Sequence, residues 1–142
     1  MIGATDQATS ECEMAIRLAP KSPQAHYGYG AFLEKHGQPG EAIAKYRQTL
    51  RLDPAHVDAH IDLGSLLFEK GETAEASEHF QKASALNPKL AQPHNYLGKL
   101  FMREGNISQA IAQFEEALRL HPEFPEAEEN LRIAKEAGAQ FP

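Results

Sequence analysis

Apolar residues recur along the chain at spacings of three and four, in short stretches separated by glycine and proline. Over residues 23–56, one apolar stripe precedes Gly37 and a second lies between Gly37 and Pro54. The two stripes consist of Tyr29, Phe32 and Leu33, and of Ala42, Ile43, Tyr46 and Leu50. Residues at this spacing fall on one face of an α-helix. The pattern therefore predicts two short helices joined by a tight turn at His36-Gly37.

Residues suited to helix ends flank both stripes. Ser22 can cap a helix N-terminus, and Pro23 and Pro39 suit a first helical turn, where the missing N–H of proline costs nothing. Glycine after the first stripe fits a left-handed C-cap, and Asp53-Pro54 ends the second helix.

The same features return at a fixed interval of 34 residues. The members of these series are Pro20, Pro54, Pro88 and Pro122; Gly3, Gly37, Gly71 and Gly105; Ala8, Ala42, Ala76 and Ala110; and Leu18, Leu52, Leu86 and Leu120. A period of this size is typical of a stacked array, in which each unit buries its faces against its neighbours. The sequence therefore predicts an all-α array of helix pairs.

Gly30, Gly64 and Gly98 form a further series inside the first helix of each pair. Each glycine inside a helix costs about 1 kcal/mol relative to alanine. Three such costs at one repeat position indicate that the two helices of a pair approach each other closely there.

Composition narrows the function classes. The 142 residues carry a net charge of -6, which argues against wrapping nucleic acid. No apolar run approaches the roughly 18 residues that a membrane span requires, so no membrane insertion is expected. The N-terminal residues show no signal-peptide pattern, and the single cysteine, Cys12, cannot form an intrachain disulfide. We expect a cytoplasmic protein.

The pattern resembles the tetratricopeptide repeat. The matching residues are Gly30, Leu33, Gly37, Ala42, Tyr46 and Pro54; Leu63-Gly64, Leu67, Gly71, Ala76, Phe80, Ala83 and Pro88; and Leu97-Gly98, Phe101, Gly105, Ala110, Phe114, Ala117 and Pro122. The resemblance implies an all-α, right-handed superhelical solenoid of antiparallel helix pairs in one domain, residues 1–142. Departures are His26, His60 and His94 in place of the family's aromatic residue, and Thr49 in place of alanine.

The ends of the array differ from its middle. The expected divisions are a half repeat at 1–22, repeats at 23–56, 57–90 and 91–124, and a polar capping helix at 125–138. The half repeat contains only a second helix. Either the chain is cut from a longer array, or another surface covers this helix; the second interpretation predicts a homodimer through it.

No arrangement of residues suited to catalysis is found, and we expect a protein that is not an enzyme and uses no cofactor. His26, His60 and His94 lie one per repeat, on neighbouring first helices about 8–10 Å apart, whereas zinc needs nitrogens at about 2.0–2.1 Å. A structural role at the contact between paired helices is expected, with no metal site. His56 and His60 lack further ligands, and Cys12 lacks a base and occupies a core position.

The resemblance places the first helices along a concave groove that holds peptides or partner helices. The residues expected to line it are Gln24, Tyr27, Ala31, Asp58, Ile61, Ser65, Phe68, Gln92, Asn95, Lys99 and Met102. Tyr27, Ile61, Phe68 and Met102 are large side chains that the core stripes do not need, so their exposure would indicate a binding surface. The alternative is that a neighbouring helix covers them.

Some members of the family grip a terminal carboxylate with Lys, Arg and Asn residues in the groove. The equivalent positions here hold Tyr27, Ala31, Asp62, Gln92 and Tyr96, so this clamp is absent. The function expected is a scaffold that binds a peptide or helix of a partner protein in the groove. The alternative is a self-assembling array, or the repeat segment of a larger multidomain protein.

Overall fold

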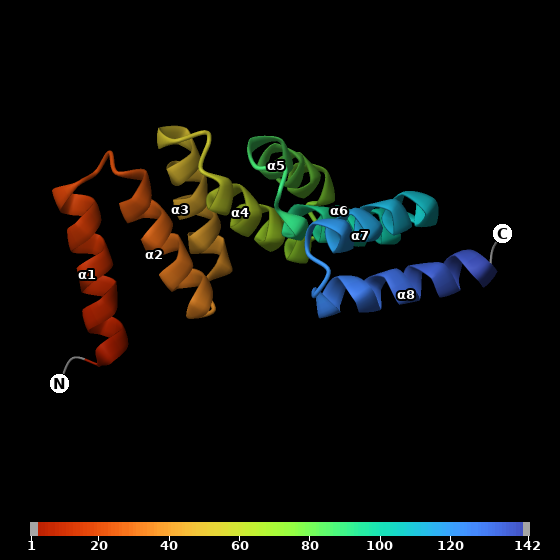
Figure 1. Cartoon of the computed structure of the whole chain (residues 1–142). Helices are drawn as coiled ribbons and strands as arrows, with labels where there is room; N and C mark the ends of the chain where they lie inside the picture. Colours follow the sequence, from red (N-terminus) through yellow and green to blue (C-terminus); the bar gives the residue numbers. More distant parts are fainter. Residues whose placement is uncertain (1–2, 141–142) are drawn as a thin grey trace.

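The computed structural model describes residues 3–140, which form eight α-helices and no strand. The helices are α1 (Ala4–Leu18), α2 (Pro23–Lys35), α3 (Pro39–Leu52), α4 (Val57–Lys70), α5 (Thr73–Leu86), α6 (Ala91–Glu104), α7 (Ile107–Leu120) and α8 (Pro125–Gln140). They follow one another as an all-α solenoid, with α1 and α8 at opposite ends (Figure 1). Helix α8 extends two residues beyond the expected limit at 138.

The helix ends carry the predicted chemistry. The Oγ of Ser22 accepts a hydrogen bond from the backbone N–H of Ala25 at 3.2 Å, and Pro23 occupies the first position of α2. Gly71 and Gly105 cap α4 and α6 in the left-handed conformation, with φ of 88° and 79°. Such backbone angles are costly for residues that have a Cβ, which explains why glycine follows these helices.

The paired helices meet where the first helix has no side chain. A Cβ built on Gly30 would lie 2.7 Å from the ring of Tyr46, and one on Gly64 would lie 2.9 Å from the ring of Phe80. Gly98 faces the ring of Phe114 in the same manner. The close approach predicted for this glycine series is confirmed, because an aromatic ring of the second helix fills the space.

The core runs through the array between successive helices. The largest cluster joins side chains of α2 to α6, among them Leu33, Tyr46, Leu67 and Phe80. At one end, α1 contributes no buried residue and packs through half-buried Cys12 and Ile16. At the other end, α8 buries two alanines, Ala127 and Ala134. Of the helices within residues 3–140, none is both long and apolar enough to cross a membrane.

Candidate protein-interaction groove

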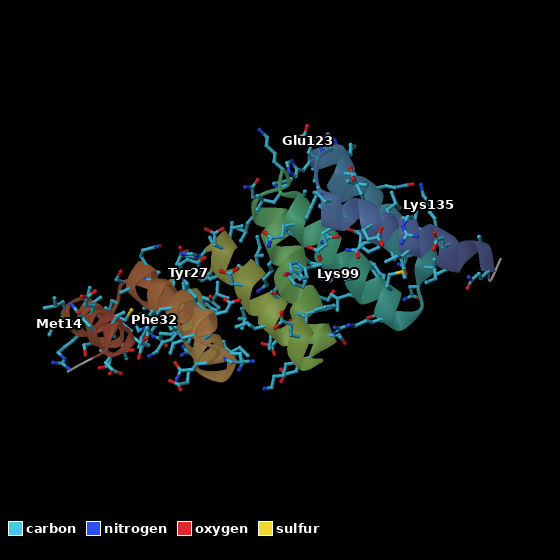
Figure 2. All side chains as sticks on the ribbon, turned by 90° about the horizontal axis from the view of Figure 1, so that it is seen from below. Met14, Tyr27, Phe32, Lys99, Glu123 and Lys135 are labelled. Atoms are coloured by element: carbon cyan, nitrogen blue, oxygen red, sulfur yellow. The ribbon has the colours of Figure 1, made fainter. Side chains whose placement is uncertain are left out.

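The first helices of successive pairs, α2, α4, α6 and α8, contact one another through polar side chains. The hydroxyl of Tyr27 donates a hydrogen bond to Asp62 at 2.8 Å, and Asn130 Nδ2 donates to Asn95 Oδ1 at 3.0 Å. In both pairs the partners are 35 residues apart, at equivalent repeat positions. We call the surface along these four helices the groove face; Tyr27 and Lys99, labelled in Figure 2, lie on different repeats of it.

Three of the residues expected to bind a partner are buried. Ile61 is 4% exposed, Phe68 is 6% exposed, and Asn95 is also buried. The expectation of exposed anchors is therefore wrong for Ile61 and Phe68. The alternative, covering by a neighbouring helix, holds for Phe68, whose ring lies under Arg103 of α6. Asn95 bonds to Asn130 on α8. Ile61 occupies the same repeat position as Tyr27 and Asn95, and both of those residues contact the next first helix.

The other expected residues remain accessible. Gln24, Asp58 and Gln92 are exposed, while Tyr27, Ser65, Lys99 and Met102 are half-buried. Ser65 shares a hydrogen bond of 2.9 Å with the hydroxyl of Tyr96 on the following first helix. Tyr27 and Ser65 thus each form a hydrogen bond to the next first helix, which leaves them less available to a ligand. Lys99 and Met102, together with buried Phe68, are expected residues that the structure brings together around a common space.

That space is a hollow of about 400 Å³ between α6 and α8. Its lining consists of Phe68, Lys99, Met102, Arg103, Phe114, Asn130 and Ile133. Ile133 is 43% exposed, which is unusual for a large aliphatic side chain in this chain. The sequence-based prediction missed Arg103, Asn130 and Ile133. Carrying the 34-residue register into the last helix would have identified Asn130 and Ile133, which are equivalent to Tyr96 and Lys99.

Two cations border the hollow and rest on aromatic rings. The guanidinium carbon of Arg103 lies 3.5 Å from the ring centre of Phe68, and its Nη1 donates to the backbone carbonyl of Phe68 at 2.7 Å. Lys99 Nζ lies 4.9 Å from the ring centre of Tyr96 and pairs with Glu126 at 2.9 Å. Cations over aromatic faces are stabilised by the ring quadrupole. The cations also explain why Phe68 is covered.

The α4 part of the groove face carries carboxylates. Asp58 is exposed, and half-buried Asp62 accepts the hydrogen bond from Tyr27. Burial raises the pKa of the Asp62 carboxyl, and burial together with the bond to Asp62 raises the pKa of the Tyr27 phenol. The groove face therefore carries carboxylates on α4 and the cations Lys99 and Arg103 on α6, with Glu126 of α8 paired to Lys99.

The repeated histidines lie at helix contacts rather than in the hollow. His60 Nε2 lies 2.7 Å from the carbonyl oxygen of Pro54, which can only accept, so this nitrogen carries the hydrogen. Its Nδ1 then accepts from Nδ1 of His79 at 3.0 Å. His94 bonds to Gln113 at the equivalent place, at 2.8 Å. Within residues 3–140, no three His, Cys, Asp or Glu side chains are grouped as metal ligands would be.

Family models of the tetratricopeptide repeat match three overlapping stretches of the sequence. The stretches are residues 11–44, 33–100 and 91–124, which together run from α1 to the end of the third pair. The chain is a tetratricopeptide repeat protein. Members of this family are typically non-catalytic scaffolds. A comparison with curated proteins gives no match.

Several solved structures share the fold. The crystal structure of MamA has a TM-score of 0.86 and 23% identity, with 98% of this chain and 86% of that chain covered. Pseudomonas aeruginosa PilF has a TM-score of 0.86 and 24% identity, with 96% and 62% covered. The first TPR of Spaghetti (RPAP3), bound to the HSP90 peptide SRMEEVD, has a TM-score of 0.78 and 25% identity, with 82% and 93% covered.

The tetratricopeptide repeat groove of this chain has no cation at the positions of the family's carboxylate clamp. Two of those positions hold Tyr27 and Asp62, which bond to each other. The cations of this groove, Lys99 and Arg103, occupy other positions, one and two turns nearer the C-terminal end of α6 than Tyr96. Cys12 lies outside the groove; its half-buried thiol packs on the core, and burial raises the pKa of that thiol.

Proposed function

We propose that this protein is a scaffold that binds a segment of a partner protein along the groove face. The observation that carries the proposal is the hollow between α6 and α8, where Met102 and Ile133 present apolar surface beside Lys99 and Arg103. A tetratricopeptide repeat array is suited to this role because its successive helices form one extended surface. The peptide bound to the first TPR of Spaghetti (RPAP3) supports a protein segment as the class of ligand.

Burial of apolar surface would supply much of the binding free energy. Covering a large aliphatic side chain fully contributes about 1.5–3 kcal/mol. Ile133 begins 43% exposed and Met102 half-buried, so each can contribute only part of that amount. A ligand must therefore use several contacts along the groove face. A segment of a protein, either extended or helical, can provide them.

The test is a pull-down from native extract that compares matched charge substitutions. Met102→Glu with Ile133→Glu places two carboxylates in the hollow, whereas Leu86→Glu alters a residue of similar exposure, 45%, on the second helix α5. The proposal predicts a partner that is retained by the wild type and by Leu86→Glu and is lost by the double variant. Circular dichroism must show that all variants keep their helix content. Equal retention by all three proteins would overturn the proposal.

Self-association through α1 is a second candidate. This helix exposes 78% of Leu18 and 46% of Met14, and none of its residues is buried. Covering these side chains in a homodimer would remove apolar surface from water. Sedimentation at increasing concentration should then show a rising mass, and Leu18→Glu should abolish the rise. A concentration-independent monomer would exclude this candidate, and it would leave binding in the groove unaffected.

Other sequence-based expectations stand as proposals. We propose a protein that does not bind nucleic acid, because carboxylates at Asp58, Asp62 and Glu126 accompany the cations of the groove face. A cytoplasmic location also remains our proposal. The chain can equally serve as the repeat segment of a larger multidomain protein, because the groove face lies within one array.

A further inference from the structure

We propose that the hollow between α6 and α8 selects a partner segment in which an aspartate or glutamate adjoins an apolar side chain. The carboxylate would bind Arg103 and Lys99, and the apolar side chain would pack on Met102 and Ile133. This inference rests on the proposed function, since it names the chemistry of the segment that the groove face binds. It places the acidic contact away from the clamp positions of the family.

Arg103 is fixed in a position to receive a carboxylate. One of its five N–H groups bonds to the carbonyl of Phe68, and its plane rests on the Phe68 ring. Arg103 is exposed and lines the hollow, so the N–H groups that do not bond to Phe68 can meet a ligand. Because the ring and the carbonyl already restrict the side chain, a ligand need not order it on binding. Two parallel N–H groups of a guanidinium match the two oxygens of a carboxylate.

Lys99 already holds a carboxylate in the free protein. Its Nζ pairs with Glu126 of α8 at 2.9 Å, and the side chains of Lys99 and Glu126 are 29% and 53% exposed. Water reaches this pair, so a ligand carboxylate can take the place of Glu126 or share the lysine with it. Glu126 thus acts as an internal competitor, and its removal should strengthen the binding of an acidic ligand.

The charges around the hollow limit the ligand to one or two carboxylates. Glu126 adjoins Lys99, and Asp58 and Asp62 lie along the same face on α4. The chain as a whole carries a net charge of -6. A polyanion that runs along the groove face would meet these carboxylates, and like charges repel. A protein segment with one local acidic site and apolar neighbours can place its carboxylate on the cations and its apolar side chain on Met102 and Ile133.

The first step of the test is a displayed library of random twelve-residue peptides, selected on the wild-type protein. The proposal predicts that the selected peptides contain Asp or Glu beside Leu, Ile, Met or Phe. One selected peptide is then labelled and titrated by fluorescence anisotropy, together with a neutral version in which Asn and Gln replace Asp and Glu. The acidic peptide should bind more tightly, and salt should weaken its binding more than that of the neutral version.

Matched variants then assign the acidic contact to its residues. Arg103→Gln should weaken the acidic peptide about tenfold and leave the neutral version nearly unchanged. Arg103→Lys keeps the charge but not the paired donors, and it should recover part of the loss. Glu126→Gln should tighten the acidic peptide severalfold. Arg119→Gln, which alters an exposed arginine of α7 outside the hollow, is the control and should change neither affinity.

The outcomes separate the two proposals. If peptides bind and Met102→Glu with Ile133→Glu abolishes binding, but no acidic preference is found, the inference is overturned and the proposed function stands. If the acidic preference survives Arg103→Gln and Glu126→Gln unchanged, the contact is elsewhere and the inference is again overturned. If no peptide is selected, or none depends on Met102 and Ile133, both proposals fail.

Discussion

Alanine at Gly64 should destabilise the protein, although alanine is the better helix former. A Cβ at this position would lie 2.9, 3.0 and 3.2 Å from three carbons of the Phe80 ring, closer than ordinary contacts between carbon atoms. The ring cannot move away easily, because it is fully buried and stacks on Tyr96 with centres 4.6 Å apart. Overpacking costs about 1–3 kcal/mol, and the gain in helix propensity offsets about 1 kcal/mol of this.

The expected net effect is a fall of up to about 2 kcal/mol in the free energy of unfolding, which follows from these two contributions. The assay is urea denaturation followed by circular dichroism. Gly28→Ala is the matched control, because Gly28 also lies inside a first helix but has no atom near its added Cβ. That control should stabilise the protein by about 0.5–1 kcal/mol. If Gly64→Ala is as stable as Gly28→Ala, the close-approach account of the glycine series is refuted.

The His60–His79 contact and the Tyr27–Asp62 hydrogen bond each give a prediction about stability. Burial lowers the pKa of His60 and, with the nearby charge of His60, that of His79, so stability should be full above pH 6.5 and fall as the pH drops below it. His79→Gln should flatten this dependence in thermal unfolding at pH 5 to 8; an unchanged slope would contradict the assignment. Tyr27→Phe leaves half-buried Asp62 without its donor and should cost about 1–2 kcal/mol in urea denaturation. Asp62→Asn should cost less, since its amide oxygen still accepts, and equal losses would weaken this account.

The sequence predicted the fold well because its boundaries depend on local chemistry. Glycine with positive φ ends α4 and α6, and proline begins α2 and α3. Residues that begin or end a helix then recur along the chain with the 34-residue period. The close contact at Gly64 was also predictable, because a glycine inside a helix has a cost that a packing contact can explain.

The candidate site was only partly predictable, because helix periodicity predicts the face on which a residue lies but not how far its neighbours bury it. Ile61 and Phe68 were expected to be exposed on the groove side, yet both are buried. Phe68 is covered by Arg103, which lies 35 residues away in sequence and bonds to the Phe68 carbonyl. The pattern of apolar and polar residues within one helix does not predict a bond to another helix. Ile133 was treated as part of a capping helix, although its repeat position matches that of Lys99 in the groove.

The most direct test of the central claim is photo-crosslinking from the hollow. A benzophenone side chain at position 133 would contact a partner segment bound to the groove face, and one at position 86 would lie on α5, outside the lining of the hollow. The account predicts a crosslinked partner peptide from position 133 and none from position 86, with mass spectrometry locating the bond. Crosslinks from position 86 alone, or equal yields from both positions, would contradict binding at the groove face.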